Sequence, residues 1–163
     1  MDIKIAIPDE RVAQALHLGY ESGVHYWCKH IRPFAGRETL LDPNTVSDRL
    51  RQAYWPIYEG MWILKDSVSG NHMPLTTLSL TRGLEVIAYD YSHTLRDIID
   101  GDITPKTGDT LIQCSVFGKV IYGRTVDDNG HVRASHLCSE CRQLPPCECQ
   151  LREALTKRPT VMP

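Results

Sequence analysis

The chain has 163 residues, of which 42% are hydrophobic and 23% charged, and its formal net charge is −2. A chain of this length can bury a core of its own, and we expect one main domain with a small appendage. The charge gives no general attraction to nucleic acid, and no apolar run approaches the roughly 20 residues that span a bilayer. The N-terminus lacks the pattern of a secretory signal, so we expect a reducing, cytoplasmic compartment and no membrane partner.

The first part of the chain predicts a short strand followed by a helix. The segment Ile3–Ile7 alternates apolar and polar residues, as a strand does. Asp9 suits the start of a helix, which would carry apolar residues at spacings of three and four as far as Trp27. Gly19 and Gly23 each cost a helix about 1 kcal/mol relative to alanine. They therefore indicate either the close approach of another element or a break in the helix.

The rest of the chain predicts further helices, a short hairpin and a second hairpin near the end. Helices are expected over 46–54, 79–89, 93–99 and 105–118, the last of them capped by Thr104 and Pro105. Met61–Leu64 and Pro74–Leu78 read as paired strands, and Asp127–Gly130 as a hairpin turn. The predicted fold class is α+β. A helix-rich domain with a small antiparallel sheet covers residues 1–123, and a C-terminal appendage resembling a zinc knuckle covers 124–163.

A group of cysteines near the C-terminus is the most chemically specific pattern in the sequence. Its members have the spacing C-x2-C-x5-C-x-C and are Cys138, Cys141, Cys147 and Cys149. Clustered cysteines in a reducing compartment bind metal more often than they form disulfides, and four thiolates suit a structural Zn2+. His136 can replace one ligand, and a metal-free or disulfide-bonded tail stays an alternative. Cys28 and Cys114 lie inside apolar segments, and we predict that both are core residues.

A second pattern of chemically active residues lies in the first predicted helix. His17, Glu21 and His25 recur every four residues, so on one continuous helix they would share a face. Two imidazoles and a carboxylate can bind a metal, and Glu21 could then act as a general base. The alternative is a solvated face in which Glu21 has a structural role beside Gly23. We take Glu21 and His25 as candidate binding residues.

Aromatic and basic residues supply two further candidate surfaces. The aromatic residues gather in one stretch and are Tyr54, Trp55, Tyr58 and Trp62. Such a group can stack on bases or anchor a partner, although aromatic clusters belong to a core more often. Basic residues gather towards the C-terminus, beginning with Arg124 and Arg133, which is a hint of nucleic-acid binding beside a zinc knuckle. The chain has no glycine-rich phosphate loop and no G-x-S-x-G elbow.

Two segments of the chain carry a resemblance to a known group of proteins. The segment Glu21-Ser22-Gly23-Val24-His25-Tyr26-Trp27 resembles small bacteriophage-encoded proteins without an assigned activity, which share a glutamate, a glycine and a Tyr-Trp pair at this spacing. The similarity continues at Asp109, Gln113, Phe117-Gly118 and Tyr122-Gly123, and the cysteine group lies outside it. The resemblance implies a phage origin and supplies no catalytic residue.

Together these patterns favour an accessory protein that binds rather than one that catalyses. We expect a phage-encoded protein with a structural zinc that binds a host protein or protein complex in the host cytosol, such as part of a defence system. One alternative is a nucleic-acid-binding zinc protein that uses the basic C-terminal region. Another is a metal-dependent hydrolase or small-nucleotide binder that uses the face of His17, Glu21 and His25.

Overall fold

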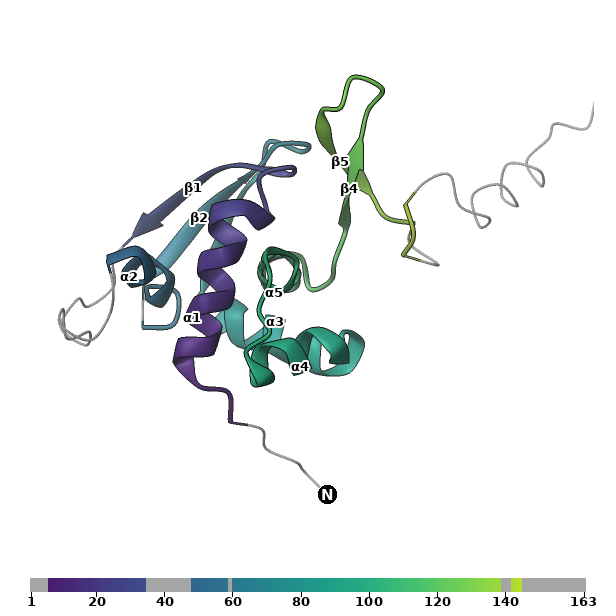
Figure 1. The fold of residues 1–163 in the computed structure, drawn as a ribbon. Coiled ribbons are helices and arrows are strands. Elements are labelled where there is room, and N and C mark those ends of the chain that lie inside the picture. Colours follow the sequence, from purple (N-terminus) through teal and green to yellow (C-terminus); the bar gives the residue numbers. More distant parts are fainter. Residues whose placement is uncertain (1–5, 35–47, 59, 139–141, 145–163) are drawn as a thin grey trace, which may run out of the picture. The chain divides into compact units, whose positions relative to one another are not determined.

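The computed structural model describes residues 6–34, 48–58, 60–138 and 142–144, and the chain divides into two compact units, Met1–Lys119 and Val120–Pro163. The helices of the first unit are α1 (Asp9–Leu18), the π-helix η1 (Gly19–Gly23), α2 (Asp48–Tyr54), α3 (Thr77–Asp90), α4 (Ser92–Asp100) and α5 (Pro105–Phe117) (Figure 1). Its strands are β1 (Cys28–Phe34), β2 (Met61–Asp66) and β3 (His72–Thr76). This mixture of helices with a small sheet confirms the α+β class.

The three strands form an antiparallel sheet in the order β1-β2-β3. The central strand β2 alternates, so that Trp62, Leu64 and Asp66 are buried while the residues between them are more exposed. The ring of Tyr20 lies 5.6 Å from the ring of Trp62, which places η1 against the buried face of the sheet. The predicted pairing of strands on either side of residues 67–71 is confirmed, but the second strand ends at Thr76, and Thr77 and Leu78 belong to α3. The sheet has a second face turned away from the core.

Helices α3 and α5 both begin at capping residues, and α5 also ends at one. Thr76 accepts from the backbone N–H of Ser79, and Thr104 accepts from that of Thr107, so each helix starts with a side-chain cap. Helix α5 ends at Gly118, whose φ of 71° suits glycine. The predicted start at Thr104 is confirmed. Among the residues with a described structure, no helix has the length and apolar character needed to cross a membrane.

The predicted long first helix is wrong in its second half. Helix α1 ends at Leu18, the chain continues as the wider turn η1 to Gly23, and β1 begins at Cys28. The cause is close packing against α5, because a Cβ on Gly19 would lie 2.8 Å from the carbonyl carbon of Gly108. The structure therefore shows both effects that the glycines in the sequence indicated, namely the close approach of another helix and a break in the α-helix. The predicted strand Ile3–Ile7 lies mostly outside the described residues.

Helix α5 is the most buried helix of the first unit, with Leu111, Ile112 and Gln113 fully buried. It contacts α1, η1 and α3. The prediction that Cys28 and Cys114 are core residues is confirmed. Burial raises the pKa of the Cys28 thiol to about 11, so that this thiol stays protonated and unreactive at neutral pH.

The described part of the second unit is a hairpin, β4 (Tyr122–Val126) paired with β5 (Val132–His136). The Asp127 carboxylate accepts from the backbone N–H groups of Asn129 and His131 and closes the turn. Gly130 there has a φ of 80°, a conformation that favours glycine. The predicted hairpin turn is therefore confirmed, and the chain passes directly from β5 to Cys138.

Candidate functional site

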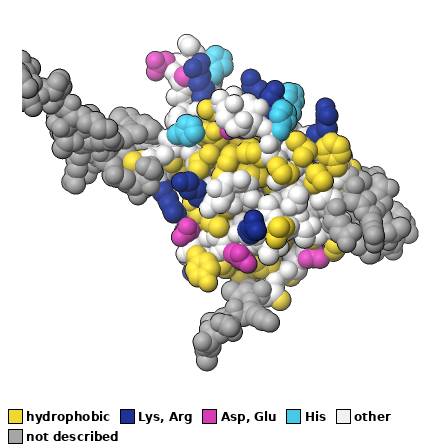
Figure 2. Space-filling model, turned by 180° about the vertical axis from the view of Figure 1, so that it is seen from behind, with side chains coloured by type: hydrophobic (Ala, Val, Ile, Leu, Met, Phe, Trp, Pro, Cys, Tyr) yellow, Lys and Arg dark blue, Asp and Glu magenta, His cyan; other side chains and the backbone are white. Residues whose placement is uncertain are grey.

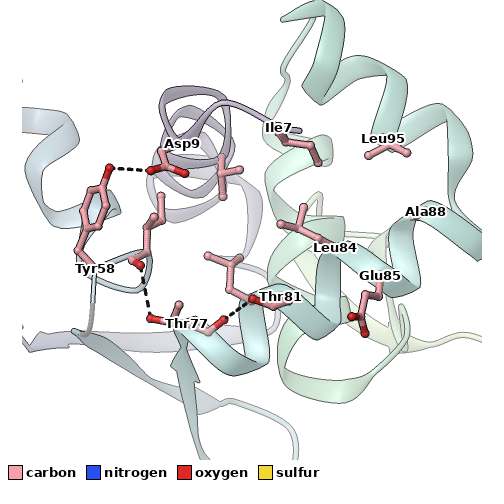
Figure 3. A pocket seen from close by; sticks show the side chains of 12 residues that line it. Ile7, Asp9, Tyr58, Thr77, Thr81, Leu84, Glu85, Ala88 and Leu95 are labelled. Carbon is pink, nitrogen blue, oxygen red and sulfur yellow. Dashed lines mark hydrogen bonds between the residues drawn. The ribbon is translucent and has the colours of Figure 1, made fainter. Parts of the chain in front are cut away.

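A pocket of about 510 Å³ lies in the first unit, between the start of α1, the turn after α2, and helices α3 and α4 (Figure 3). Its volume is within the usual range of ligand pockets, roughly 300–1,000 Å³. The walls are mainly aliphatic and include Ile7, Val12, Leu80, Leu84 and Leu95. A few polar side chains also line this mainly apolar cavity, among them Asp9 and Tyr58.

A short hydrogen bond defines the polar end of the pocket. The hydroxyl of Tyr58 donates to Oδ2 of Asp9 at 2.6 Å (Figure 3). Asp9 lies in the first turn of α1, where a negative charge is stabilised by the helix dipole. The bond to Asp9, and then burial, raise the pKa of Tyr58 to about 12. The phenol is therefore a fixed, neutral donor at physiological pH.

The lining carries negative charge. Asp9 lies on one side of the pocket and Glu85 of α3 on the other, while no lysine, arginine or histidine is among the lining residues (Figure 3). Tyr54 lies outside the pocket lining and is affected by the same negative charge. Burial raises the pKa of Tyr54, and the carboxylates of Glu10 and Asp9 raise it further. A positively charged or donor-rich group is consequently favoured at this mouth over an anion.

The aromatic residues predicted to bind a partner have different positions in the structure. Tyr58 lines the pocket, and Tyr54 is buried behind it with the two rings stacked, 5.9 Å apart and 5° from parallel. Trp62 is 1% exposed and donates its indole N–H to the carbonyl of Gln52, so it is a core residue and presents no binding surface. Trp55 is half-buried outside the pocket lining.

The face proposed for His17, Glu21 and His25 does not form. Nε2 of His17 lies 3.6 Å from Oε1 of Glu21, but His25 comes after the π-helix and bonds the carbonyl of Tyr20 instead. The widened turn of η1 breaks the four-residue spacing that a common face requires. Within the described ranges, no group of three histidine, cysteine or acidic side chains is arranged to hold a metal ion.

Five of the residues quoted for the sequence resemblance come together as a structural cluster: Tyr26, Trp27, Asp109, Gln113 and Phe117. Oδ1 of Asp109 accepts from the indole N–H of Trp27, and Oδ2 accepts from the hydroxyl of Tyr26, both at 2.7 Å. Gln113 donates to both oxygens at 3.1 Å, and the ring of Phe117 lies 5.4 Å from that of Trp27. These contacts join the segment after η1 to α5.

Most of the predicted cysteine site lies outside the described residues. This applies to Cys141, Cys147 and Cys149, whereas Cys138 is buried. The backbone N–H of Cys138 donates to the carbonyl of Gln143, and the carbonyl of Cys138 accepts from Arg142, both at 2.9 Å. Arg142 has a φ of 57°, so the chain turns sharply here.

Sequence reasoning missed most of the pocket, including Asp9 as a lining residue and Glu85. The sequence indicates Tyr58 only as a member of an aromatic group. The residues that line the pocket come from four separate segments, and no local spacing relates them. The Asp109 cluster had a local signal, because Asp109, Gln113 and Phe117 recur every four residues on one helix.

Comparison with known proteins gives no relative: no family model, no curated protein and no solved structure matches this chain.

Proposed function

We propose that the chain is a phage-encoded accessory protein that binds a host protein in the host cytosol and so interferes with a host activity such as defence. The observation that supports this best is the pocket between α1, α3 and α4, with aliphatic walls and a carboxylate on each side. Pockets of this composition bury an apolar group and orient it through a few polar contacts. The phage origin in this proposal rests on the sequence resemblance alone.

The chemistry at the polar end of the pocket favours binding over catalysis. A general base works best with a pKa near the operating pH, whereas Tyr58 has a pKa of about 12 and is held by Asp9. The proton therefore stays on the hydroxyl of Tyr58, and the carboxylate of Asp9 is a fixed hydrogen-bond acceptor. A partner side chain with an apolar stem and a positively charged end would fit this site. Its stem would pack against the aliphatic walls, and its charge would lie near the carboxylates of Asp9 and Glu85.

A capture experiment with a matched pair of variants tests this function. Thr81→Arg places a long cation inside the pocket, whereas Leu78→Arg places the same side chain on the same helix outside the pocket, where Leu78 is 62% exposed. We expect immobilised protein and the Leu78→Arg variant to retain one stoichiometric host protein that Thr81→Arg loses. Capture of no such protein, or equal capture by both variants, would contradict the proposal.

We also propose a structural Zn2+ held by Cys138, Cys141, Cys147 and Cys149. The donor set suits zinc because four thiolates form a closed tetrahedral site. A zinc ion with four thiolate ligands would have a structural role and supply no reaction. Native mass spectrometry should find one zinc per chain, lost in the variant Cys138→Ser/Cys147→Ser; a metal-free wild-type protein would refute the site.

The two alternative functions have less support from the geometry. On the second unit, Nη2 of Arg133 lies 2.9 Å from Oδ2 of Asp127, which partly neutralises a residue of the proposed nucleic-acid surface. The hydrolase alternative requires His17, Glu21 and His25 on one face, and the π-helix separates His25 from the other two.

A further inference from the structure

The open face of the β1-β2-β3 sheet is a second surface with a distinct composition. The residues of β2 that turn away from the core are Met61, Ile63 and Lys65, which alternate with the buried ones. Each has a partner on both neighbouring strands, so the face consists of rows across the sheet. The rows are Phe34, Met61 and Thr76, then Arg32, Ile63 and Pro74, then His30, Lys65 and His72.

Apolar and basic groups are separated along this face. At one end Phe34 is 45% exposed and Met61 39% exposed, next to Ile63. Towards the other end lie the cations Arg32 and Lys65, together with two histidines. Figure 2 shows a band of hydrophobic side chains on the back of the molecule, with basic and histidine side chains along its upper edge.

No negative charge balances the basic end of the face within the strands. The one carboxylate in the three strands, Asp66, is 2% exposed and lies on the buried side. Its oxygens accept from the backbone N–H of Val68 and the hydroxyl of Ser69, so Asp66 organises the turn between β2 and β3. The field at the open face is therefore positive, opposite in sign to the field at the pocket.

We infer that this face docks an amphipathic helix of a protein partner, with its apolar stripe on Phe34, Met61 and Ile63 and its acidic edge against Arg32 and Lys65. Three strands about 4.8 Å apart make a platform as wide as a helix, roughly 10–12 Å across. Apolar burial supplies the affinity and the charges fix the direction of the helix.

The composition of the face favours a protein helix over single-stranded nucleic acid. Sheets that bind single strands stack two or three bases on neighbouring aromatic side chains, whereas on this face the row of aliphatic Ile63 and Pro74 separates the ring of Phe34 from those of His30 and His72. Aliphatic side chains bury the aliphatic stripe of a helix well. The surface shares no residue with the pocket, so this inference does not depend on the proposed function.

Fluorescence anisotropy with a designed probe tests the inference. The probe is a helical peptide of about 18 residues with leucine at i, i+3, i+4 and i+7 and alanine and glutamate elsewhere. A second peptide has lysine in place of glutamate. We expect the full chain to bind the acidic peptide, less tightly as salt is added, and to bind the basic peptide at least about tenfold more weakly.

Two variant pairs probe the two ends of the face. Arg32→Glu/Lys65→Glu and Phe34→Ser/Met61→Ser should each weaken binding of the acidic peptide by about tenfold or more. Arg82→Glu/Lys106→Glu, an equal change of charge at exposed positions on α3 and α5, should leave binding within about twofold. Circular dichroism should show that all three variants stay folded.

Three results would overturn the inference. These are no binding of the acidic peptide, equal binding of the two peptides, and a control pair that weakens binding as much as Arg32→Glu/Lys65→Glu does. An oligothymidine single strand or anionic phosphatidylglycerol vesicles that bind more tightly than the peptide, and lose binding in Arg32→Glu/Lys65→Glu, would instead assign the face to nucleic acid or to a membrane surface.

Discussion

At the scale of single residues, Asp109 has the largest structural role that the contacts reveal. Its two carboxylate oxygens accept from Tyr26, Trp27 and Gln113, and the amide of Gln113 also donates to the Tyr26 hydroxyl at 3.0 Å. Only a carboxylate offers acceptors on both sides, because an amide would turn a donor towards one of these groups. Asp109 is therefore suited to hold the chain after η1 against α5.

Asp109→Asn should lower the free energy of unfolding by about 3 kcal/mol, because hydrogen bonds to a charged group are lost and a donor faces a donor. Urea unfolding followed by tryptophan fluorescence measures this change. The matched variant Asp102→Asn, at an exposed position, should change stability by less than about 0.5 kcal/mol. Similar losses in both variants would show that Asp109 has no special role.

Tyr58→Phe should lower stability by about 1 kcal/mol at neutral pH, the net value of one hydrogen bond. The folded state raises the pKa of Tyr58 from 10.0 to about 12, so it favours the protonated phenol. This contribution is complete below pH 10 and is lost as the pH rises towards 12. The difference between wild type and variant, measured by urea unfolding, should therefore shrink across that interval; a difference that grows with pH would refute the assignment.

At the scale of elements, the crossing of α1 and η1 over α5 depends on a pair of small residues. Gly19 and Gly108 face each other, and a Cβ on Gly108 would lie 2.7 Å from Cα of Gly19. The atoms that a Cβ on Gly108 would meet all belong to the backbone, so no side chain could move to make room for it. The close approach brings Gly23 onto the start of α5, where Tyr26 and Trp27 then reach Asp109.

Gly108→Ala should lower the free energy of unfolding by about 2 kcal/mol, since overpacking against backbone forces the helices apart. Helix propensity alone predicts the opposite sign, a gain of about 1 kcal/mol for alanine. Thermal unfolding followed by circular dichroism separates the two. Lys106→Ala, at an exposed position of the same helix, serves as control, and a stabilised Gly108→Ala variant would show that the helices are not in close contact.

Local signals in the sequence predicted those elements that carry their own start and stop residues. Thr104 and Gly118 mark both ends of α5, and Asp127–Gly130 marks the hairpin turn. The sequence of β1 has no such marker, and η1 arises from contact with Gly108, a residue far along the chain. The pocket was missed for the same reason, because Asp9 of α1 and Glu85 of α3 line one cavity only through the tertiary arrangement of the chain.

At the scale of the whole molecule, the first unit carries two surfaces of opposite charge. The pocket with Asp9 and Glu85 favours a cationic group, and the open sheet face with Arg32 and Lys65 favours an acidic one. Opposite fields on separate surfaces reduce competition between ligands, because a group that suits one surface is repelled by the other. Each surface is built entirely from residues of the unit Met1–Lys119.

A chain ending at Lys119 should therefore fold and keep both surfaces. The shortened chain keeps the buried residues of the first unit, such as Trp27, Leu64 and Leu111, and all residues of the Asp109 cluster. We expect a cooperative urea transition with a midpoint close to that of the full chain, and no effect of a zinc chelator on it, because the proposed cysteine site is in the second unit. The full chain serves as control, with chelator expected to change only its hairpin signals in NMR spectra. A truncated chain that lacks a cooperative transition would show that the second unit is needed to complete the core of the first.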